Sequence, residues 1–211
     1  MIDVTHQISA VRRRVGTRTL EAGEARIVVI SQTYDAAVED VWDACTNAER
    51  IPRWFLPVSG ELKPGGRYQL EGNAGGTIER CDPPEGFFIT WEYGGEVSWV
   101  EVRLTAAAPD RTRLEIEHIA HVSDELWAQF GPGAVGIGWD SMILGLSLHL
   151  SGGPAMDPAQ GAAWAASDEG RRFMTLSGER WCAAHIASGG AEAQARAMSE
   201  RVIAAYTTVP S

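Results

Sequence analysis

From residue 26 to residue 120, hydrophobic and polar positions alternate in short runs that are separated by glycine and proline. This two-residue period is typical of antiparallel strands with one dry face and one wet face. The pattern predicts strands over residues 26–34, 67–71, 77–81, 87–93, 98–104 and 113–120. We therefore expect a sheet whose dry face another part of the chain must cover.

The last of these predicted strands shows the alternation most clearly. Its dry positions are expected to be Leu114, Ile116, His118 and Ala120. Its wet positions are Arg113, Glu115 and Glu117, and Glu101 and Arg103 are expected beside them on the neighbouring strand as part of a solvated face.

One predicted helix is apolar enough to cover the dry face. Residues 138–150 place large apolar side chains at the spacing of a buried helical face, namely Trp139, Met142, Ile143, Leu146 and Leu150. This helix spans about 20 Å and is too short to cross a bilayer. Shorter helices are predicted over residues 38–45, with Asp35 as the cap, and after a capping box at residues 46–49.

Both ends of the chain are predicted to be helical. The spacing of Ile2, Ile8, Val11 and Val15 predicts a short helix that Gly16 ends. After a stop at residues 151–154, helices are predicted from Ser167 to the glycines at 189–190 and over residues 191–206. The chain thus divides into an N-terminal helical extension (1–25), a central domain (26–153) and a C-terminal helical extension (154–211). The C-terminal helices have three roles open to them: covering a strand edge, lying over a pocket mouth, or forming a homodimer interface.

Several short motifs, in their order and spacing, resemble a known family. They are Tyr34-Asp-Ala-Ala-Val-Glu-Asp-Val-Trp42, Arg53-Trp54, Gly65-Gly66, Asp82-Pro83-Pro84, Thr90-Trp91-Glu92, Thr112-Arg-Leu-Glu-Ile-Glu-His118 and Gly138-Trp139. The chain resembles the SRPBCC superfamily with its START-like helix-grip fold, and within it the homologues of the activator of the heat shock protein 90 ATPase. The resemblance implies an α+β fold in which a seven-stranded antiparallel sheet wraps round the long helix, with a cavity between them for an apolar ligand.

The resemblance does not imply one activity. Members of the superfamily include lipid and hormone carriers, polyketide cyclases and chaperone activators, and they share no catalytic residue, so no nucleophile or base is carried over. Three functions stay open. The favoured one is binding of a hydrophobic small molecule in the cavity. The others are an enzyme of the polyketide cyclase or hydrolase type, in which His118 and a bound water do acid–base work, and a chaperone-associated module that binds protein through an acidic sheet face.

Charge and composition narrow the partners and the chemistry. The formal net charge is −10 at pH 7, and residues 26–153 carry nine basic against nineteen acidic side chains, which gives −10 for that segment. Such a surface repels phosphate backbones and anionic headgroups, so neither nucleic acid nor membrane is an expected partner.

Lys63 is the single lysine, which leaves little scope for amine chemistry. The start of the chain lacks a secretory pattern, and Cys45, Cys81 and Cys182 form no CxxC pair, so we expect reduced thiols in a cytoplasmic protein.

The dry positions supply the candidate ligand-binding residues. They are Trp54, Trp91, Tyr93, Val100, Leu114, His118, Trp139, Met142 and Ile143. These residues are expected to line an aromatic-rich pocket; the alternative is that large side chains fill the core. A ligand-binding or proton-shuttling role of His118 competes with that of a satisfied core histidine. The core role is favoured because no carboxylate on the same face would orient the ring.

Two further patterns are weighed and set aside. Residues 131–136 match GxGxxG, but a dinucleotide site needs a preceding parallel strand, whereas residues 123–127 predict a helical turn. The glycines are expected instead to let the chain turn and the helix lie close to the sheet. Cys182 and His185 share a helix face but supply only two metal ligands. Neither a metal nor a cofactor is therefore predicted.

Overall fold

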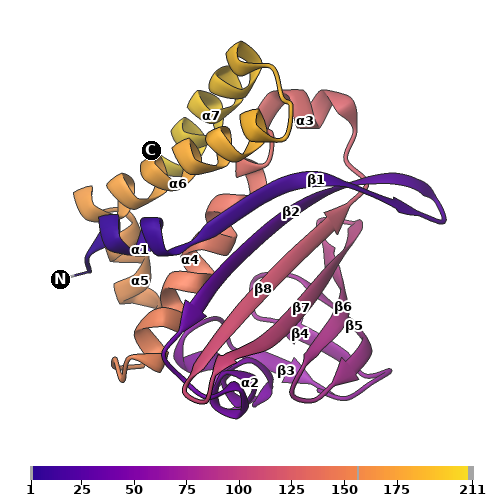
Figure 1. The fold of residues 1–211 in the computed structure, drawn as a ribbon, viewed down its shortest axis with the longest axis vertical. Coiled ribbons are helices and arrows are strands. Elements are labelled where there is room, and N and C mark those ends of the chain that lie inside the picture. Colours follow the sequence, from indigo (N-terminus) through magenta and orange to yellow (C-terminus); the bar gives the residue numbers. More distant parts are fainter. Residues whose placement is uncertain (1, 156, 209–211) are drawn as a thin grey trace. The chain divides into compact units, whose positions relative to one another are not determined.

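The computed structural model describes residues 2–155 and 157–208, and the protein has an α+β helix-grip fold (Figure 1). Its strands form one eight-stranded sheet in the order β1-β2-β8-β7-β6-β5-β4-β3. The chain divides into two compact units. We call Ser31–Ala120 with Met142–Met156 the grip unit, and Met1–Ile30, His121–Ser141 and Asp157–Ser211 the terminal unit. Strand β2 (Gly23–Tyr34) and helix α4 (Gly133–Leu150) run from one unit into the other.

The grip unit is an antiparallel meander preceded by a short helix. After the end of β2 come α2 (Val38–Thr46), a 3-10 turn (Ile51–Arg53), β3 (Val58–Gly60), β4 (Arg67–Leu70), β5 (Gly75–Asp82), β6 (Gly86–Tyr93), β7 (Glu96–Ala108) and β8 (Arg111–Ala120). Each strand from β3 to β8 pairs with the next in antiparallel register. The predicted strands over residues 67–120 are thus confirmed, each within a few residues.

The strand register assigns each side chain of β5–β8 to one of two faces. Directly opposite residues share a face, so one side carries the rows Cys81-Phe87-Val102-Ile116 and Ile78-Ile89-Val100-His118. We call this side the dry face. The opposite side, the outer face, carries the row Arg80-Phe88-Glu101-Glu117 and the pair Arg103-Glu115.

The N-terminal segment differs from the predicted helix. Helix α1 covers only Val4–Ala10, and Arg12–Leu20 form strand β1, an eighth strand where the resemblance implied seven. The expected continuation of the helix through Val15 is wrong because this stretch is rich in β-branched residues and interrupted by Gly16, and both features favour a strand over a helix.

Two predicted helix caps are also wrong. Helix α2 has Ala37 at its N-cap, and Asp35 pairs instead with Arg111. The capping box at residues 46–49 does not form, because the Thr46 hydroxyl donates back to the Trp42 carbonyl oxygen within α2. The Asn47 side chain accepts from the Glu49 amide and starts the turn in its place.

The terminal unit is mostly helical. Besides α1, β1 and parts of β2 and α4, it contains α3 (Asp124–Phe130), α5 (Pro158–Ala165), α6 (Asp168–Ala187) and α7 (Glu192–Thr207). Ser167 caps α6 through the Gly170 amide, as its position before Asp168 predicts. Helices α6 and α7 lie side by side (Figure 1), and α6 also packs on β1, an edge strand of the sheet. Of the three roles left open for these helices, covering a strand edge agrees with this packing.

The glycines at residues 131–136 allow close helix packing within the terminal unit. Gly131 ends α3 with a φ of 58°, a conformation that favours glycine. Gly133 and Gly136 lie in α4, and a Cβ at these positions would clash with Val202 of α7 and Trp181 of α6. The sequence analysis expected these glycines to let the helix lie close to the sheet. The structure shows instead that they let α4 lie close to two helices, α6 and α7.

A buried ion pair, which the sequence analysis did not predict, ties three elements of the terminal unit together. Asp140 of α4 accepts from Arg13 of β1 at 3.0 and 2.6 Å, from Ser177 at 2.5 Å and from Trp181 at 2.9 Å. Four donors thus compensate the burial of this carboxylate.

In residues 2–155 and 157–208, no helix combines the length and hydropathy that a membrane crossing needs.

Candidate ligand-binding face

The dry face of the grip unit is unevenly buried. On β7 and β8, Val100, Val102, Leu114 and Ile116 are fully buried. On β5 and β6, the residues of the same face are only half-buried, although β6 is hydrogen-bonded to a strand on each side. These residues are Ile78, Cys81, Phe87, Ile89 and Trp91. Helix α2 packs on β7 and β8 and reaches β6 through Trp42, whose ring centroid lies 6.2 Å from that of Phe87. An apolar and aromatic surface therefore stays accessible over β5 and β6.

His118 borders this accessible surface as a neutral side chain. Its Nε2 lies 2.9 Å from Ser98 Oγ, and Ser98 in turn donates to the Trp91 carbonyl oxygen at 3.1 Å. The ring centroids of Trp91 and His118 are 6.3 Å apart. Burial lowers the pKa of His118 to about 4, so the imidazole is uncharged at neutral pH and is a weak base.

The other predicted ligand-binding residues lie in different surroundings. Trp54 is buried, stacks on Phe55 and donates from its indole Nε1 to the Ala44 carbonyl oxygen, so it holds the turn after α2. Tyr93 is 61% exposed at the end of β6. Met142 and Ile143 are buried on the part of α4 that belongs to the grip unit, and Trp139, also buried, belongs to the terminal unit. Trp91, Val100, Leu114 and His118 are the predicted residues that the sheet brings onto one face.

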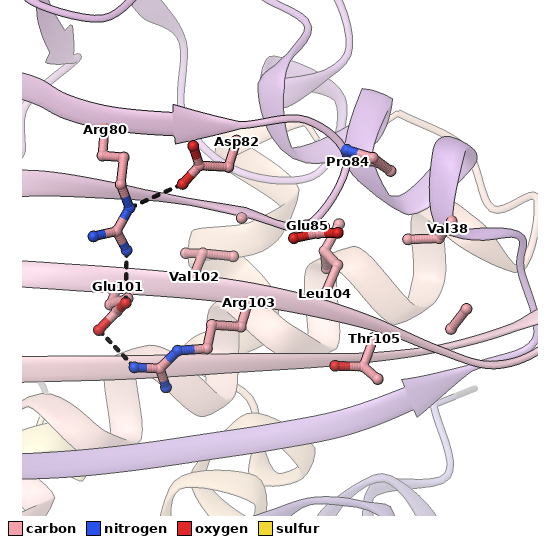
Figure 2. A pocket seen from close by; sticks show the side chains of 12 residues that line it. Val38, Arg80, Asp82, Pro84, Glu85, Glu101, Val102, Arg103, Leu104 and Thr105 are labelled. Carbon is pink, nitrogen blue, oxygen red and sulfur yellow. Dashed lines mark hydrogen bonds and ion pairs between the residues drawn. The ribbon is translucent and has the colours of Figure 1, made fainter.

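The outer face differs from the solvated acidic surface that the sequence analysis expected. Glu101 and Glu117 lie directly opposite each other and are only 7% and 6% exposed. Figure 2 shows Arg80 and Arg103 converging on Glu101, at 2.8 and 2.6 Å, with Asp82 on the far side of Arg80. The series continues across β8, where Glu115 pairs with Arg103 and Arg113. Carboxylates and guanidinium groups thus compensate one another on this face.

A shallow hollow of about 580 Å³ lies beside this charged series. Figure 2 shows its two ends: Arg80, Glu101 and Arg103 line one, and Val38 and Leu104 line the other. The hollow contains none of the predicted ligand-binding residues. Its two arginines are already engaged by Glu101, so it offers no free cation to an anionic ligand.

Sequence reasoning placed some of the relevant residues on the right face but gave them no role. Ser98, Phe87 and Ile89 follow the predicted alternation, and a serine within an apolar row next to a histidine is the signal that would have singled out Ser98. Cys45, Cys81 and Cys182 are free thiols. The described residues contain no group of three or more His, Cys, Asp or Glu side chains that could hold a metal ion, so Cys182 and His185 gain no further ligand.

The sheet, the gripped helix and the accessible apolar face define a helix-grip protein of the SRPBCC type. The chain also matches the family model described as activator of Hsp90 ATPase homolog 1-like protein, over residues 35–150. Because the match spans more than half of the 211 residues, the chain belongs to this family.

Solved structures agree with this assignment. The chain is 39% identical to CalU16 from Micromonospora echinospora; in the crystal structure of that protein the TM-score is 0.67, with 83% of this chain and 98% of CalU16 covered. In its solution structure the TM-score is 0.69, with 86% and 97% covered. An HSP90 activator from Plasmodium falciparum shares the fold at 20% identity, with a TM-score of 0.51 and 62% and 99% covered. No curated protein matches the chain.

Proposed function

We propose that the protein binds a hydrophobic small molecule on the dry face of its grip unit, over β5 and β6. The observation that carries the proposal is the half-burial of Phe87, Ile89 and Trp91 on a strand that has a neighbour on both sides. Apolar side chains at the centre of a sheet are normally covered, so an apolar surface that stays accessible there supports a site that another molecule covers.

The electrostatics of the face support an uncharged ligand. Burial holds His118, the titratable side chain in the row of Ile89, in its neutral form at physiological pH because its pKa is about 4. A weakly basic imidazole that already contacts Ser98 supports a lining role better than acid–base catalysis. On the outer face, Arg80, Arg103 and Arg113 compensate Glu101 and Glu115, so these carboxylates offer little unpaired charge to a protein partner.

Analysis of the purified protein by native mass spectrometry tests the proposal first. We expect an apolar molecule to be carried through purification, or a thermal-shift screen of polyketides, fatty acids and sterols to give concentration-dependent stabilisation. Absence of both would contradict small-molecule binding and would direct attention to protein partners.

Two adjacent phenylalanines locate the site. Phe87 lies on the dry face, whereas Phe88 lies on the outer face with the guanidinium of Arg80 5.7 Å from its ring centroid. Both are half-buried. Because contact with one aromatic side chain is worth about 1.5–3 kcal/mol, Phe87→Ala should weaken binding of the screened ligand by about 10- to 100-fold, and Phe88→Ala should leave it nearly unchanged. Equal losses in the two variants would place the site elsewhere.

A further inference from the structure

Strand β7 extends past the end of its neighbour β6, at the hollow that lies beside the charged series. The pairing of β6 with β7 ends at Gly86 and Arg103, whereas the pairing of β7 with β8 continues to Ala108. The last backbone hydrogen bond on the β6 side runs from the Leu104 amide to the Glu85 carbonyl oxygen, at 2.7 Å. Beyond Leu104, this edge of β7 therefore has no neighbouring strand among the described residues.

Ala106 carries the free backbone groups of this edge. Alternate residues of a strand direct their N–H and C=O groups to the same edge, so those of Ala106 point to the same side as the Leu104 amide. Glu85 does not continue the pairing, because its own amide donates to the Asp82 carbonyl oxygen at 2.7 Å and the chain turns away. Residues 105–108 are all exposed. The backbone of Ala106 is thus accessible to a strand from outside the protein.

The hollow gives such a strand room. It measures about 580 Å³, and its end away from the charged series is lined by residues 104–106 of β7, residues 84–86 before β6, and Val38 of α2 (Figure 2). Strand edges are commonly blocked by charged side chains or proline, but residues 105–108 are one threonine and three alanines. The register shifts between Ala106 and Ala108, which ends the regular edge. The space therefore suits a segment of only a few residues.

The unpaired charge of the hollow is negative. Arg80 and Arg103 are both engaged by Glu101, and Arg80 also pairs with Asp82 at 2.9 Å. Glu85 lines the hollow, is exposed and forms no ion pair within the described residues. A basic side chain on the incoming segment would be attracted to Glu85, and an acidic one would be repelled.

We propose that a short extended segment of a partner protein, carrying a basic side chain, adds as a strand to the edge of β7 at Ala106. Its backbone pairs with the N–H and C=O groups of Ala106, and its basic side chain pairs with Glu85. Addition of a peptide to an exposed sheet edge is a general mode of recognition, in which the backbone supplies the affinity and the side chains supply the specificity. The inference goes beyond the proposed function and does not rest on it.

Hydrogen exchange in the ligand-free protein tests the free edge first. The Ala106 amide should exchange at least about 10-fold faster than the Thr105 amide, because Thr105 points to the other edge and pairs with Arg113 of β8. The two rates are measured by NMR on the isotope-labelled full-length protein. Equal protection of the two amides would mean that Ala106 already has a partner, and would contradict the proposal.

Three capped pentapeptides test binding and charge: acetyl-Thr-Val-Arg-Val-Thr-amide and its variants with Gln or Glu at the centre. Titrated into the labelled protein, the Arg peptide should bind about 2- to 5-fold more tightly than the Gln peptide, and the Glu peptide should bind most weakly. Saturation with the Arg peptide should slow the exchange of the Ala106 amide. Glu85→Gln should remove the preference for Arg over Gln and leave the affinity for the Gln peptide unchanged.

Two substitutions at one position locate the contact. Ala106→Pro removes the N–H that the proposal uses and should weaken binding of the Arg peptide by about 3- to 10-fold, whereas the matched control Ala106→Val should keep it. Proline is tolerated where the N–H of a strand edge faces solvent, so Ala106→Pro should melt within about 3 °C of the wild type. Thr105→Pro should melt at least about 5 °C lower, because it loses a hydrogen bond to β8.

The outcomes that overturn the inference are distinct from those that overturn the proposed function. Equal binding of the Arg peptide to the wild type and Ala106→Pro, or no binding of any of the three peptides at their highest soluble concentration, would show that this edge accepts no strand. If Ala106→Pro does not fold, unchanged exchange of the wild-type Ala106 amide at peptide saturation contradicts the proposal in its place. None of these results bears on the dry face, which Phe87→Ala tests separately.

Discussion

The two faces of the sheet in the grip unit differ in how their buried polar groups are compensated. On the outer face, Glu101 is almost inaccessible, yet Arg80 and Arg103 both donate to it, and the series of opposite charges continues to Glu115. On the dry face, His118 loses its charge and the apolar side chains of β5 and β6 stay half-buried. The buried carboxylate of the outer face is thus compensated within the protein, whereas the dry face keeps apolar side chains that are only partly covered.

This difference shows why the dry face is the better candidate for binding. A ligand gains little from displacing charged groups that already satisfy one another, because their interactions must be broken first. It gains more from covering half-buried apolar side chains. The largest described hydrogen-bonded charge series and the proposed ligand site therefore lie on opposite sides of the same strands.

The largest expected effect tests the uneven burial of the dry face. Ile116 on β8 is fully buried and Ile89 on β6 is half-buried, so the same substitution has two expected costs. Ile116→Ala should lower the free energy of unfolding by about 2–5 kcal/mol, and Ile89→Ala by about 1–2 kcal/mol. Urea denaturation of both variants measures the difference. Equal losses would mean that β6 is packed as tightly as β8 and that no apolar surface is accessible there.

The next effect concerns the lost charge of His118. Its pKa is about 4 in the folded protein against 6.5 ordinarily, so protonation favours the unfolded chain. The stabilisation that the neutral imidazole contributes is complete above pH 6.5. It is lost as the pH falls from 6.5 to about 4, and the free energy of unfolding drops by about 3 kcal/mol in total. His118→Gln should remove this part of the pH dependence, as measured by denaturant titrations at several pH values.

His149 provides the control for that titration. Burial lowers its pKa too, with Arg50 and Arg53 adding to the shift, but its side chain is only half-buried. His149→Gln should therefore flatten the pH dependence much less than His118→Gln. If His118→Gln keeps the wild-type slope between pH 6.5 and 4, the imidazole is not held neutral by burial and the dry face is wetter than its packing indicates.

The strands and the main helices could be predicted because their signals are local. Alternation in residues 87–120 gives the two faces of β6–β8, and the run of apolar residues before Leu150 gives α4. Strand β1 was missed because the spacing of Val11 and Val15 fits either a helix or a strand edge, and the choice depends on pairing with β2. The domain boundaries at residues 25 and 153 stay a prediction.

The features that matter most for the site depend on contacts distant in the sequence. Alternation tells on which face Glu101 and Glu117 lie, but whether that face is covered depends on segments elsewhere, so their burial was not foreseen. Asp140 stands within an apolar run, and its partner Arg13 is 127 residues away.

The smallest expected effect tests whether the charges of the outer face compensate one another. Glu101→Gln replaces one oxygen that accepts from Arg80 or Arg103 by an amide nitrogen that cannot, so it breaks one charged hydrogen bond without changing volume. Both arginines are about half exposed and regain water, so the loss should be about 1–2 kcal/mol. Glu115→Gln, at a more exposed carboxylate, should cost less than about 1 kcal/mol and should lose most of its effect in high salt. Both variants should bind the ligand of the dry face as the wild type does; weakened binding in Glu101→Gln would show that the two faces are coupled and that the charged series helps to shape the site.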